Sequence, residues 1–553
     1  MNVSLDRPWF KFWPEGVPKH IDYPEIPLFA LLKNSAEKFP EKVAFSYRDR
    51  HMTYRELDAL TDRFAAALGD VVEKGDRVMI FIPNLLEHVI SYYGILKAGA
   101  IVSSLSPLAK EIELEHQLQK IDVDTIIVDG PRYPIVKHVQ GNLKVRNVIF
   151  VGGDAPAGTL PFDDLVNHPS TPPAFEVNPR EDVAAIQFTG GTTGMPKGAM
   201  MTHHNLVSNA IMNAAWFKWT AEEVVLDVLP LYHTWGACCC MHSPIYVGAR
   251  TILFERPPPP PSTTLRRSRV APDMGLWLQI IEHEKVTVWY GAATMFIVLV
   301  NYPDLTKYDL SSLRYVKIGA MPIPSETRRK WEELTGVPMI LGYGLTEASP
   351  ETHSSPIERV KSGTIGIPII DTDAKIVDEE IGTDDLPIGA IGELVIKGPQ
   401  VMKGYWEDEE RTKEALRDGW LYTGDIGKMD GEGYFYIVDR KKDLIKYKGY
   451  SVYAAEVEDV MYLHSAVKEC AVVGIPDEDL TVGEKPKAFI VLQNGIKATD
   501  KLKADLISFC AERIAPYKRI REVEFLLVLP KTPVGKVLKR VLRENELKRA
   551  QGR

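Results

Sequence analysis

The segment from Thr189 to Gly198, which reads Thr-Gly-Gly-Thr-Thr-Gly-Met-Pro-Lys-Gly, constrains the fold more than any other part of the chain. Its hydroxyl groups and glycines cannot build a core, but they favour a turn whose exposed backbone N–H groups surround an anion. Lys197 adds a mobile positive charge. The segment lacks the Gly-Lys-Ser/Thr ending of a Walker A loop. It follows an apolar run at 183–188, so we expect a phosphate-binding loop after a strand; an ordinary Gly/Thr-rich surface loop is the alternative.

The residues around this loop predict an α/β fold. Thr53-Tyr-Arg-Glu56 is a capping box that begins a helix with one apolar face, and Gly69 ends that helix. Apolar runs at 77–82, 100–103, 125–128 and 145–151 are typical of strands, with a helix expected over 85–97. Strands separated by helices imply parallel βαβ units, and such sheets bind ligands at the carboxyl ends of their strands.

The C-terminal part of the chain shows a different pattern. Strand and turn signals between 376 and 397 predict a smaller β-rich region. The last hundred residues predict a compact α+β unit, with strands over 470–475, 487–492 and 522–529 and a helix over about 501–514.

Composition excludes several classes of protein. The formal net charge of −9 over 553 residues argues against a nucleic-acid partner. Residues 1–16 lack the pattern of a signal peptide, and the longest apolar stretch, 288–300, is too short to span a bilayer. Five cysteines in a chain of this length do not suggest a disulfide framework. Cys238, Cys239 and Cys240 lack metal-site spacing and predict a buried apolar segment, so a reducing cytoplasm is the expected location.

A proline-rich segment interrupts the α/β pattern. Residues 256–273 contain the consecutive prolines Pro257 to Pro261, followed by a run rich in serine, threonine and arginine. Proline supplies no N–H donor, so neither a regular strand nor a regular helix is expected there. We interpret the segment as an exposed insertion with polyproline II conformation; a reading-frame error and a proline-rich docking site are the alternatives.

Further motifs follow the loop in a fixed order. They are Gly319-Ala-Met-Pro, Leu341-Gly-Tyr-Gly-Leu-Thr-Glu347, Trp420-Leu-Tyr-Thr-Gly-Asp425, the run from Tyr434 through Asp439-Arg440 to Gly449, and Pro530-Lys-Thr-Pro-Val-Gly-Lys536. Together with the loop, they resemble the acyl-adenylate-forming (AMP-binding) superfamily, which contains acyl-CoA synthetases, beetle luciferases and adenylation domains of peptide synthetases. The resemblance covers nearly the whole chain. It implies a large domain over 1–439 and a small, mobile α+β domain over 440–553 that carries a catalytic lysine.

The resemblance also implies a role for each matching residue. Catalytic roles fall to Lys536, Thr346, Glu347 and His233, with Glu347 also a magnesium ligand. ATP and AMP contacts fall to Thr189, Gly190, Gly191, Thr192, Thr193, Gly194, Lys197, Gly319, Ala320, Met321, Gly342, Tyr343, Gly344, Asp425 and Arg440. Lys442 would be the hinge between domains, and Lys446, Lys448 and Gly449 would serve coenzyme A. Trp235, Gly236, Gly291 and Ala292 would line an acyl pocket.

The residue types suit this chemistry. A carboxylate and ATP are both anions, so positive groups such as Lys536 must offset the charge that grows in the transition state. Magnesium prefers hard oxygen ligands and binds through few carboxylates, as Glu347 would allow. Tyr343 offers an aromatic face to adenine, and both oxygens of Asp425 can accept the two ribose hydroxyls. Taken alone, a lone lysine, a core tyrosine and a surface Asp–Arg pair would be unremarkable; their shared context favours function.

The acyl acceptor and the acid are less constrained. No carrier domain follows Lys536, which favours coenzyme A as acceptor, and no acidic residue stands near 233–236 to hold an amino acid's ammonium group. Small residues such as Gly291 and Ala292 favour a medium or long fatty acid, while Trp235 would favour short acids if it closed the pocket. We therefore predict an ATP-dependent acid–CoA ligase that releases pyrophosphate. An aryl- or short hydroxy-acid ligase, a luciferase-like oxygenase and a non-catalytic scaffold protein are the alternatives, and a homodimer is possible.

Overall fold

The structure is a computed structural model that describes residues 7–141, 143–169, 171–189, 196–254, 274–319, 323–379, 382–448, 450–477, 482–531 and 537–551. Several predicted positions lie outside the described residues: the proline segment, the loop residues Gly190 to Gly194, and also Ala320, Met321, Gly449 and Lys536. The remaining predictions are compared with the structure below.

The first large sheet carries the predicted phosphate loop. Its strand order is β19-β9-β8-β4-β3-β5-β6-β7. The strands span β3 Arg77–Phe81, β4 Ile101–Ser104, β5 Thr125–Asp129, β6 Asn147–Val151, β7 Leu160–Pro161, β8 Val183–Phe188, β9 Gly198–Thr202 and β19 Gly404–Tyr405. The pairs from β8 through β4, β3, β5 and β6 to β7 are parallel, as predicted. However, β8 and β9 pair antiparallel, so the loop joins a hairpin and does not lead directly into a helix.

The second large sheet carries the Gly-rich strand and its neighbours. Its order is β16-β15-β14-β13-β12-β10-β11-β1-β2. The strands span β1 Val43–Tyr47, β2 Arg50–Thr53, β10 Val224–Asp227, β11 Arg250–Leu253, β12 Val288–Ala292, β13 Tyr315–Gly319, β14 Met339–Gly344, β15 Glu351–Ser354 and β16 Ile367–Pro368. The pairs among β1 and β10 to β14 are parallel, whereas β15 and β16 continue the sheet antiparallel.

Helices cover both faces of the two sheets. The helices of the large region span α1 Phe29–Lys38, α2 Tyr54–Leu68, α3 Leu86–Lys97, α4 Glu111–Lys120, α5 Tyr133–Gln140, α6 Phe162–Val166, α7 His203–Trp216, α8 Thr234–Gly236, α9 Ser243–Val247, α10 Met274–Glu284, α11 Ala293–Leu299, α12 Ser325–Thr335 and α13 Glu409–Ala415. One buried cluster joins apolar residues of α1, α2, α3 and α7 to both sheets, so these helices lie between the sheets. In β3, Val78 and Ile80 face that cluster while Met79 and Phe81 face α4 and α5. A parallel sheet covered on both faces explains the nearly continuous apolar strands of the sequence.

Two local predictions are confirmed. Thr53 and Glu56 form the capping box of α2, and Gly69 caps its C-terminus. Cys238, Cys239 and Cys240 lie in a fully buried π-helix, η2 Ala237–His242, which packs against α7. No helix in the described part of the chain combines the length and the apolar character that crossing a membrane requires.

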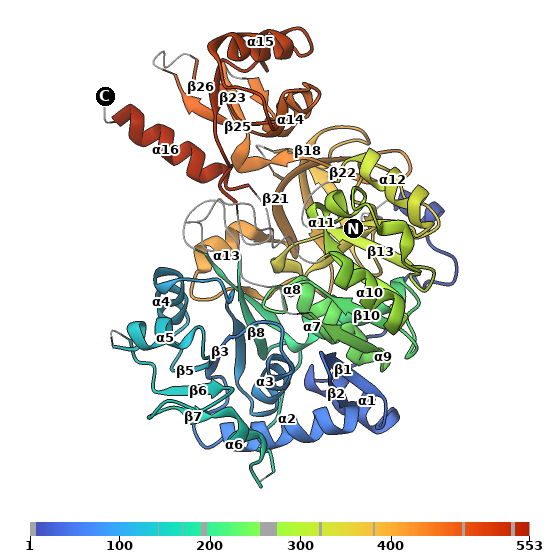
Figure 1. Ribbon diagram of the computed structural model, residues 1–553, viewed down its shortest axis with the longest axis vertical. Helices are drawn as coiled ribbons and strands as arrows, with labels where there is room; N and C mark the ends of the chain where they lie inside the picture. The colour runs from blue at the N-terminus through green and yellow to red at the C-terminus, as the bar shows by residue number, and fades with distance from the viewer. Residues whose placement is uncertain are drawn as a thin grey trace.

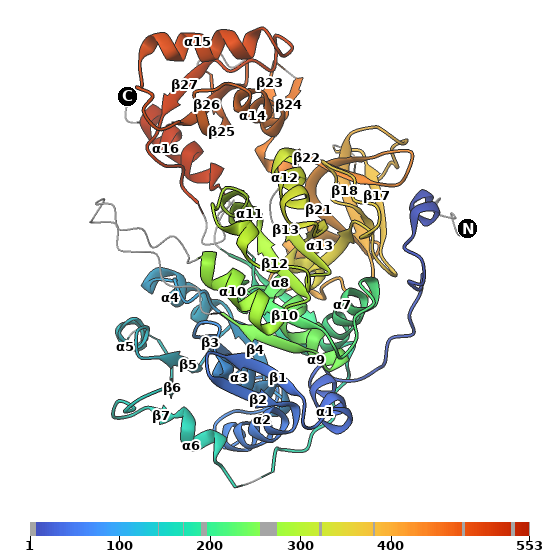
Figure 2. The same ribbon diagram turned by 45° about the vertical axis from the view of Figure 1, so that its right-hand side comes forward.

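The C-terminal part contains the β-rich region and the small domain. In the β-rich region, β17 Asp373–Val377, β18 Gly392–Lys397, β20 Leu416–Arg417, β21 Trp420–Met429 and β22 Phe435–Arg440 form one antiparallel sheet. The small domain contains β23 Ile445–Tyr447, β24 Tyr450–Val452, β25 Val467–Pro476, β26 Glu484–Leu492 and β27 Glu522–Phe525, with helices α14 Ala454–Tyr462, α15 Asp500–Ala511 and α16 Lys539–Gln551. Figures 1 and 2 show it at the top of the molecule, beyond the β-rich region.

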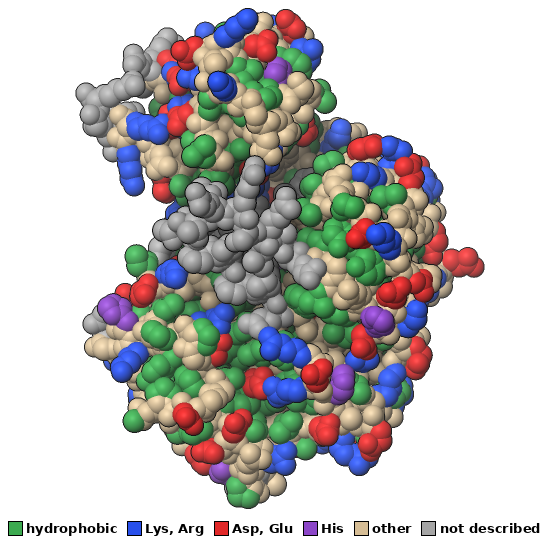
Figure 3. Space-filling model, in the orientation of Figure 1, with side chains coloured by type: hydrophobic (Ala, Val, Ile, Leu, Met, Phe, Trp, Pro, Cys, Tyr) green, Lys and Arg blue, Asp and Glu red, His purple; other side chains and the backbone are tan. Residues whose placement is uncertain are grey.

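The predicted fold class is thus confirmed, with a large α/β domain and a small α+β domain. On the face shown in Figure 3, acidic and basic side chains are interspersed over both domains. The predicted boundary between residues 439 and 440 stays a prediction.

Candidate active site

The hairpin that carries the predicted phosphate loop meets the predicted magnesium ligand through a tyrosine. The Thr189 N–H donates to the Lys197 carbonyl (2.9 Å), which closes the base of the loop. The Lys197 ammonium lies 4.6 Å from the centre of the Tyr405 ring, and the Tyr405 hydroxyl donates to Glu347 Oε1 (2.8 Å). Tyr405 reaches this position because β19 pairs with β9, opposite Ala199. Charge and aromatic surface from separate parts of the chain therefore gather at the base of the loop.

Burial tunes the charges in this group. It lowers the pKa of Lys197, and the positive charge of Arg411 adds to that effect, while Glu347 opposes it. Burial and the neighbouring Glu347 raise the pKa of Tyr405, so its hydroxyl stays protonated and remains a donor at neutral pH. Thr346 and Glu347 begin a short 3₁₀ helix, η4 Thr346–Ala348, directly after the turn that ends β14.

A second group of site residues gathers around Asp425. The Tyr343 hydroxyl donates to Asp425 Oδ2 (2.6 Å), and Arg440 Nε lies 3.1 Å from Asp425 Oδ1. Asp425 and Arg440 are cross-strand partners on β21 and β22, whereas Tyr343 comes from β14. Burial opposes the charge of Arg440, but Asp425 outweighs it and raises the pKa of Arg440. The residues predicted for adenine, ribose and phosphate are thus in contact with one another.

Close backbone approach fixes the glycines of the Gly-Tyr-Gly strand. A side chain at Gly344 would place its Cβ 2.2 Å from the Pro350 carbonyl oxygen, and one at Gly342 would place it 2.7 Å from Lys317 Cε. The Pro350 carbonyl group belongs to the backbone and cannot move away as a flexible side chain can. Only glycine therefore fits at Gly344 without a local shift. Tyr343 is held between these two positions, on the strand β14.

The predicted acyl-pocket residues divide into two groups. A Cβ at Gly319 would lie 3.1 Å from the Trp235 ring, so Trp235 covers Gly319 directly. A Cβ at Gly236 would lie 2.3 Å from the Pro230 carbonyl oxygen, which explains a glycine after Trp235. Gly291, in contrast, faces Phe296 on the other side of the sheet, since its neighbour Tyr290 contacts Trp235 edge-on. The structure therefore places Trp235 against Gly319, but it does not place Gly291 against Trp235. Ala292, the last residue of β12, directly follows Gly291.

His233 sits at the start of the Trp235 turn as a neutral group. Its Nδ1 accepts the Trp235 backbone N–H (3.1 Å), which caps α8. Burial lowers the pKa of His233 to about 4, so the imidazole is uncharged at neutral pH. A neutral histidine can hydrogen-bond a carboxylate or water, but it does not offer a permanent charge to the acid.

The predicted hinge and coenzyme A residues lie where the small domain begins. Lys442 belongs to η5 Lys441–Asp443, immediately after β22, and burial, aided by the charge of Arg440, lowers its pKa to about 8. Lys446 on β23 pairs with Glu379 of the large domain (3.6 Å). Lys448 adopts a left-handed backbone conformation, with φ of 50°.

Magnesium fits the residues present. Glu347 supplies one carboxylate, and no cluster of three or more potential metal ligands occurs within the described ranges. This arrangement suits magnesium, which binds proteins through one or two carboxylates and completes its octahedron with nucleotide phosphates and water.

One contributor was missed by the sequence. Tyr405 lies in Lys403-Gly-Tyr-Trp406, a segment without a motif that would mark it. Tyr405 reaches the candidate site only because the two residues of β19 pair with β9, and no local sequence pattern predicts that pairing.

Comparison with known proteins agrees with this geometry. Residues 32–406 match the AMP-binding enzyme family, and residues 456–536 match the AMP-binding enzyme C-terminal domain. The chain belongs to the AMP-binding enzyme family. The predictions of an AMP-forming acid–thiol ligase that uses ATP, Mg²⁺ and coenzyme A are confirmed.

Individual relatives align over nearly the full length. A long-chain-fatty-acid–CoA ligase of Bacillus subtilis is 39% identical, with 98% of this chain and 99% of the relative covered. A protein of the same description from Yersinia pestis is 36% identical, with the same coverage. Among solved structures, an anthranilate CoA ligase in complex with anthranoyl-AMP superposes with a TM-score of 0.83 at 30% identity, covering 96% of this chain and 99% of that one. ATP-bound MatB from Rhodopseudomonas palustris gives 0.82 at 28% identity, covering 94% and 99%.

Proposed function

We propose that this chain joins a medium- or long-chain fatty acid to coenzyme A through an acyl-adenylate. The observation that carries the nucleotide part is the meeting of β9, β14, β19, β21 and β22 at Glu347 and Asp425. The fatty-acid part is supported by the neutral His233 and the aromatic Trp235, which offer no charge to hold an amino acid, and by relatives described as long-chain-fatty-acid–CoA ligases.

The first half-reaction joins the acid to ATP. A carboxylate oxygen attacks the α-phosphorus, and pyrophosphate leaves with the electrons of the broken P–O bond. Lys197 and the loop N–H groups would face the triphosphate, while Asp425 and Arg440 would hold the ribose once Tyr343 turns to the base. Magnesium, with Glu347 as its protein ligand, would screen the phosphate charges as the anions approach. We assign Lys536 to the same step, where its charge stabilises the pentavalent transition state.

The second half-reaction transfers the acyl group. The thiol sulfur of coenzyme A attacks the acyl carbon, its proton is lost to solvent, and AMP leaves. We propose that the small domain begins at residue 440 and turns about Lys442 between the two steps. This turn would remove Lys536 and present Lys446, Lys448 and Gly449. The end of β22 at Arg440 and the short η5 supply a natural boundary for such a motion.

A pyrophosphate-release assay tests this function. Purified full-length protein would receive Mg-ATP and one acid at a time from a panel of straight-chain fatty, aryl and amino acids. We expect release with fatty acids, and thioester only after coenzyme A is added. Turnover confined to aryl acids would replace the fatty-acid assignment, and turnover with free amino acids would contradict the neutral acid site.

We also propose a cellular location and an oligomeric state for the protein. The five cysteines are all free thiols and all buried, which supports a reducing cytoplasm; fractionation of cells would test it. A homodimer stays a prediction for sedimentation velocity.

A further inference from the structure

Tyr405 contacts two charged residues of the candidate site through different parts of its side chain. Its hydroxyl donates to Glu347 Oε1 (2.8 Å), and the centre of its ring lies 4.6 Å from the Lys197 ammonium. Among the described residues, neither charge forms an ion pair, and no other side chain donates a hydrogen bond to the Glu347 carboxylate. Buried charges are usually paired, so two charges without a protein counter-ion remain available to a ligand.

The position of Tyr405 is fixed from two sides. Its own N–H donates to Thr412 Oγ1 of α13 (2.9 Å), and the N–H of the next residue, Trp406, donates to the Gly198 carbonyl of β9 (2.8 Å). Tyr405 is only 7% exposed, so packing also restricts its ring. A hydroxyl on a ring that is held in this way has a defined position, which a group that orients another residue requires.

The same short segment holds the main chain of Glu347. The Met402 N–H donates to the Glu347 carbonyl (2.8 Å), three residues before Tyr405. Glu347 is therefore fixed at its backbone and at Oε1, and Oε2 is left for a ligand. A glutamate that is already oriented loses less side-chain freedom when it binds. Carboxylates that bind metals are generally hydrogen-bonded by neighbouring groups, and removal of such a neighbour commonly costs 10- to 100-fold in metal affinity.

A second tyrosine in the chain has similar neighbours but lies outside the candidate site. The Tyr436 hydroxyl donates to Asp430 Oδ2 (3.0 Å), and the Lys428 ammonium lies 5.4 Å from its ring centre. There the carboxylate is already paired, because Lys361 lies 2.6 Å from the same oxygen. Tyr436 thus belongs to a network whose acid has its counter-ion, whereas the acid at Tyr405 has none among the described residues.

We propose that Tyr405 is a positioning residue: its hydroxyl orients Glu347 for magnesium, and its ring supports Lys197 beside the phosphate loop. One side chain would thereby align the two charges that meet the triphosphate. The hydroxyl would act only through Glu347, and the ring only through Lys197. This inference rests on the proposed function, because it takes Glu347 as the magnesium ligand and Lys197 as a triphosphate contact.

Calorimetric binding of α,β-methylene-ATP to the full-length protein separates the two contacts. The affinity is measured with EDTA and with excess Mg²⁺, and the ratio of the two dissociation constants gives the advantage due to the metal. Tyr405→Phe keeps the ring and loses the hydroxyl, so its affinity with EDTA should match wild type, while the Mg²⁺ advantage should fall about 10-fold. Tyr405→Leu also loses the ring, so its affinity with EDTA should fall roughly 3- to 10-fold as well.

A double variant tests whether the hydroxyl acts through Glu347. Glu347→Gln/Tyr405→Phe should lose no more of the Mg²⁺ advantage than Glu347→Gln alone, and additive losses would overturn the inference. Tyr436→Phe is the matched control and should bind the nucleotide like wild type in both conditions. An Mg²⁺ advantage in Tyr405→Phe that equals or exceeds that of wild type would overturn the inference, and so would an equal loss in Tyr436→Phe. If Tyr405→Leu fails to fold, Tyr405→Phe decides.

The pyrophosphate assay keeps the proposed function separate from this inference. With a fatty acid as substrate, Tyr405→Phe should need about 10-fold more free Mg²⁺ for its half-maximal rate, and saturating Mg²⁺ should restore most of the rate. If wild type binds the nucleotide with an Mg²⁺ advantage but releases pyrophosphate with no acid, the proposed function is wrong and the calorimetry alone decides the role of Tyr405. If Mg²⁺ brings wild type no advantage, the magnesium role of Glu347 and this inference are both wrong.

Discussion

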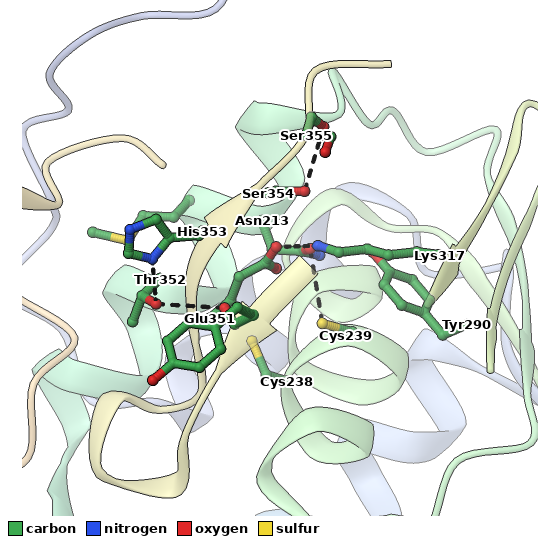
Figure 4. A network of polar contacts seen from close by, with 12 residues as sticks. Asn213, Cys238, Cys239, Tyr290, Lys317, Glu351, Thr352, His353, Ser354 and Ser355 are labelled. Atoms are coloured by element: carbon green, nitrogen blue, oxygen red, sulfur yellow. Dashed lines mark hydrogen bonds and ion pairs between the residues drawn. The ribbon is translucent and has the colours of Figure 1, made fainter. Parts of the chain in front are cut away.

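The nucleotide side and the acid side of the candidate site are held together in different ways. On the nucleotide side, Lys197, Glu347, Asp425 and Arg440 contact one another or a tyrosine that bridges them, through hydrogen bonds and charge. On the acid side, Trp235 lies on Gly319 through van der Waals contact, and His233 is neutral. The buried ion pair of Lys317 and Glu351 lies further along the same face of the sheet, with the Lys317 ammonium 5.8 Å from the Tyr290 ring (Figure 4).

This difference predicts different responses to substitution. Removal of one partner of a charged pair inside the protein should weaken ligand binding strongly, because the remaining charge is left uncompensated. Binding at a packed aromatic group depends on the volume of its neighbours, and the effect of a substitution is moderate where a side chain can adjust. The following predictions sharpen or break this comparison.

Lys536→Ala should cause the largest loss. Removal of one preorganised electrostatic contact often lowers the rate ~10²–10³-fold, and we expect at least that for acyl-adenylate formation. Thioester formation from synthetic acyl-adenylate should stay near the wild-type rate, since we assign Lys536 to the first step alone. Single-turnover rates of both steps would measure this. Equal damage to both steps would contradict the two-conformation mechanism.

Asp425→Ala should weaken ATP handling strongly. It removes the partner of the half-buried Arg440 and a hydrogen-bond acceptor of Tyr343. A hydrogen bond to a charged group contributes about 1.5–3 kcal/mol, so KM for ATP should rise roughly 10- to 100-fold. KM for the acid should change little. A rise in the acid KM alone, with ATP kinetics intact, would move Asp425 away from the nucleotide side.

Gly319→Ala should act on the acid side, because Trp235 covers Gly319, although the resemblance places Gly319 among the nucleotide contacts. The added Cβ would lie 3.1 Å from Trp235, so the ring must shift by a few tenths of an ångström. We expect kcat/KM for the best acid to fall roughly 3- to 10-fold, which corresponds to about 1 kcal/mol of strain. KM for ATP is the control. If ATP binding suffers more than the acid does, Gly319 belongs to the nucleotide side.

Lys442→Met should have the smallest effect, and it should depend on pH. The folded protein holds the pKa of Lys442 at about 8, below that of the unfolded chain, which disfavours the charged form. Wild type should therefore be less stable than Lys442→Met below pH 8, and the difference should shrink as pH rises from about 8 to 10.5, where the unfolded lysine also loses its proton. Melting temperatures of both proteins across this range would measure it. A difference that does not change with pH would contradict the lowered pKa of Lys442.

Much of the fold follows from local sequence. The capping box at Thr53, the alternating strands and helices, and the α+β end of the chain all have periodic or capping signals, and the structure confirms them. The contact between Tyr343 and Asp425 also agrees with their motifs. The cap, the strands and the helices are predictable because each is encoded within a few neighbouring residues, whereas the roles of Tyr343 and Asp425 were predicted from the family resemblance.

The features that were not predicted depend on pairing between distant segments. The phosphate loop joins a hairpin because β8 finds β9 as an antiparallel neighbour, and loop composition does not specify that. Tyr405 reaches Lys197 through the β19–β9 pairing, and the ion pair joins residues 317 and 351 across a strand. Gly291 faces away from Trp235 because the pleat of β12 places it there, and a small residue alone gives no direction.

Both edges of the first sheet end in strands of two residues, and this has a consequence for how copies of the chain meet. An edge strand exposes unpaired N–H and C=O groups on which another chain can build. Here the edges are Gly404–Tyr405 and Leu160–Pro161, and Pro161 has no N–H to offer. The strand that brings Tyr405 to the candidate site thus also covers β9, and its length of two residues leaves little edge on which strand-by-strand aggregation could begin.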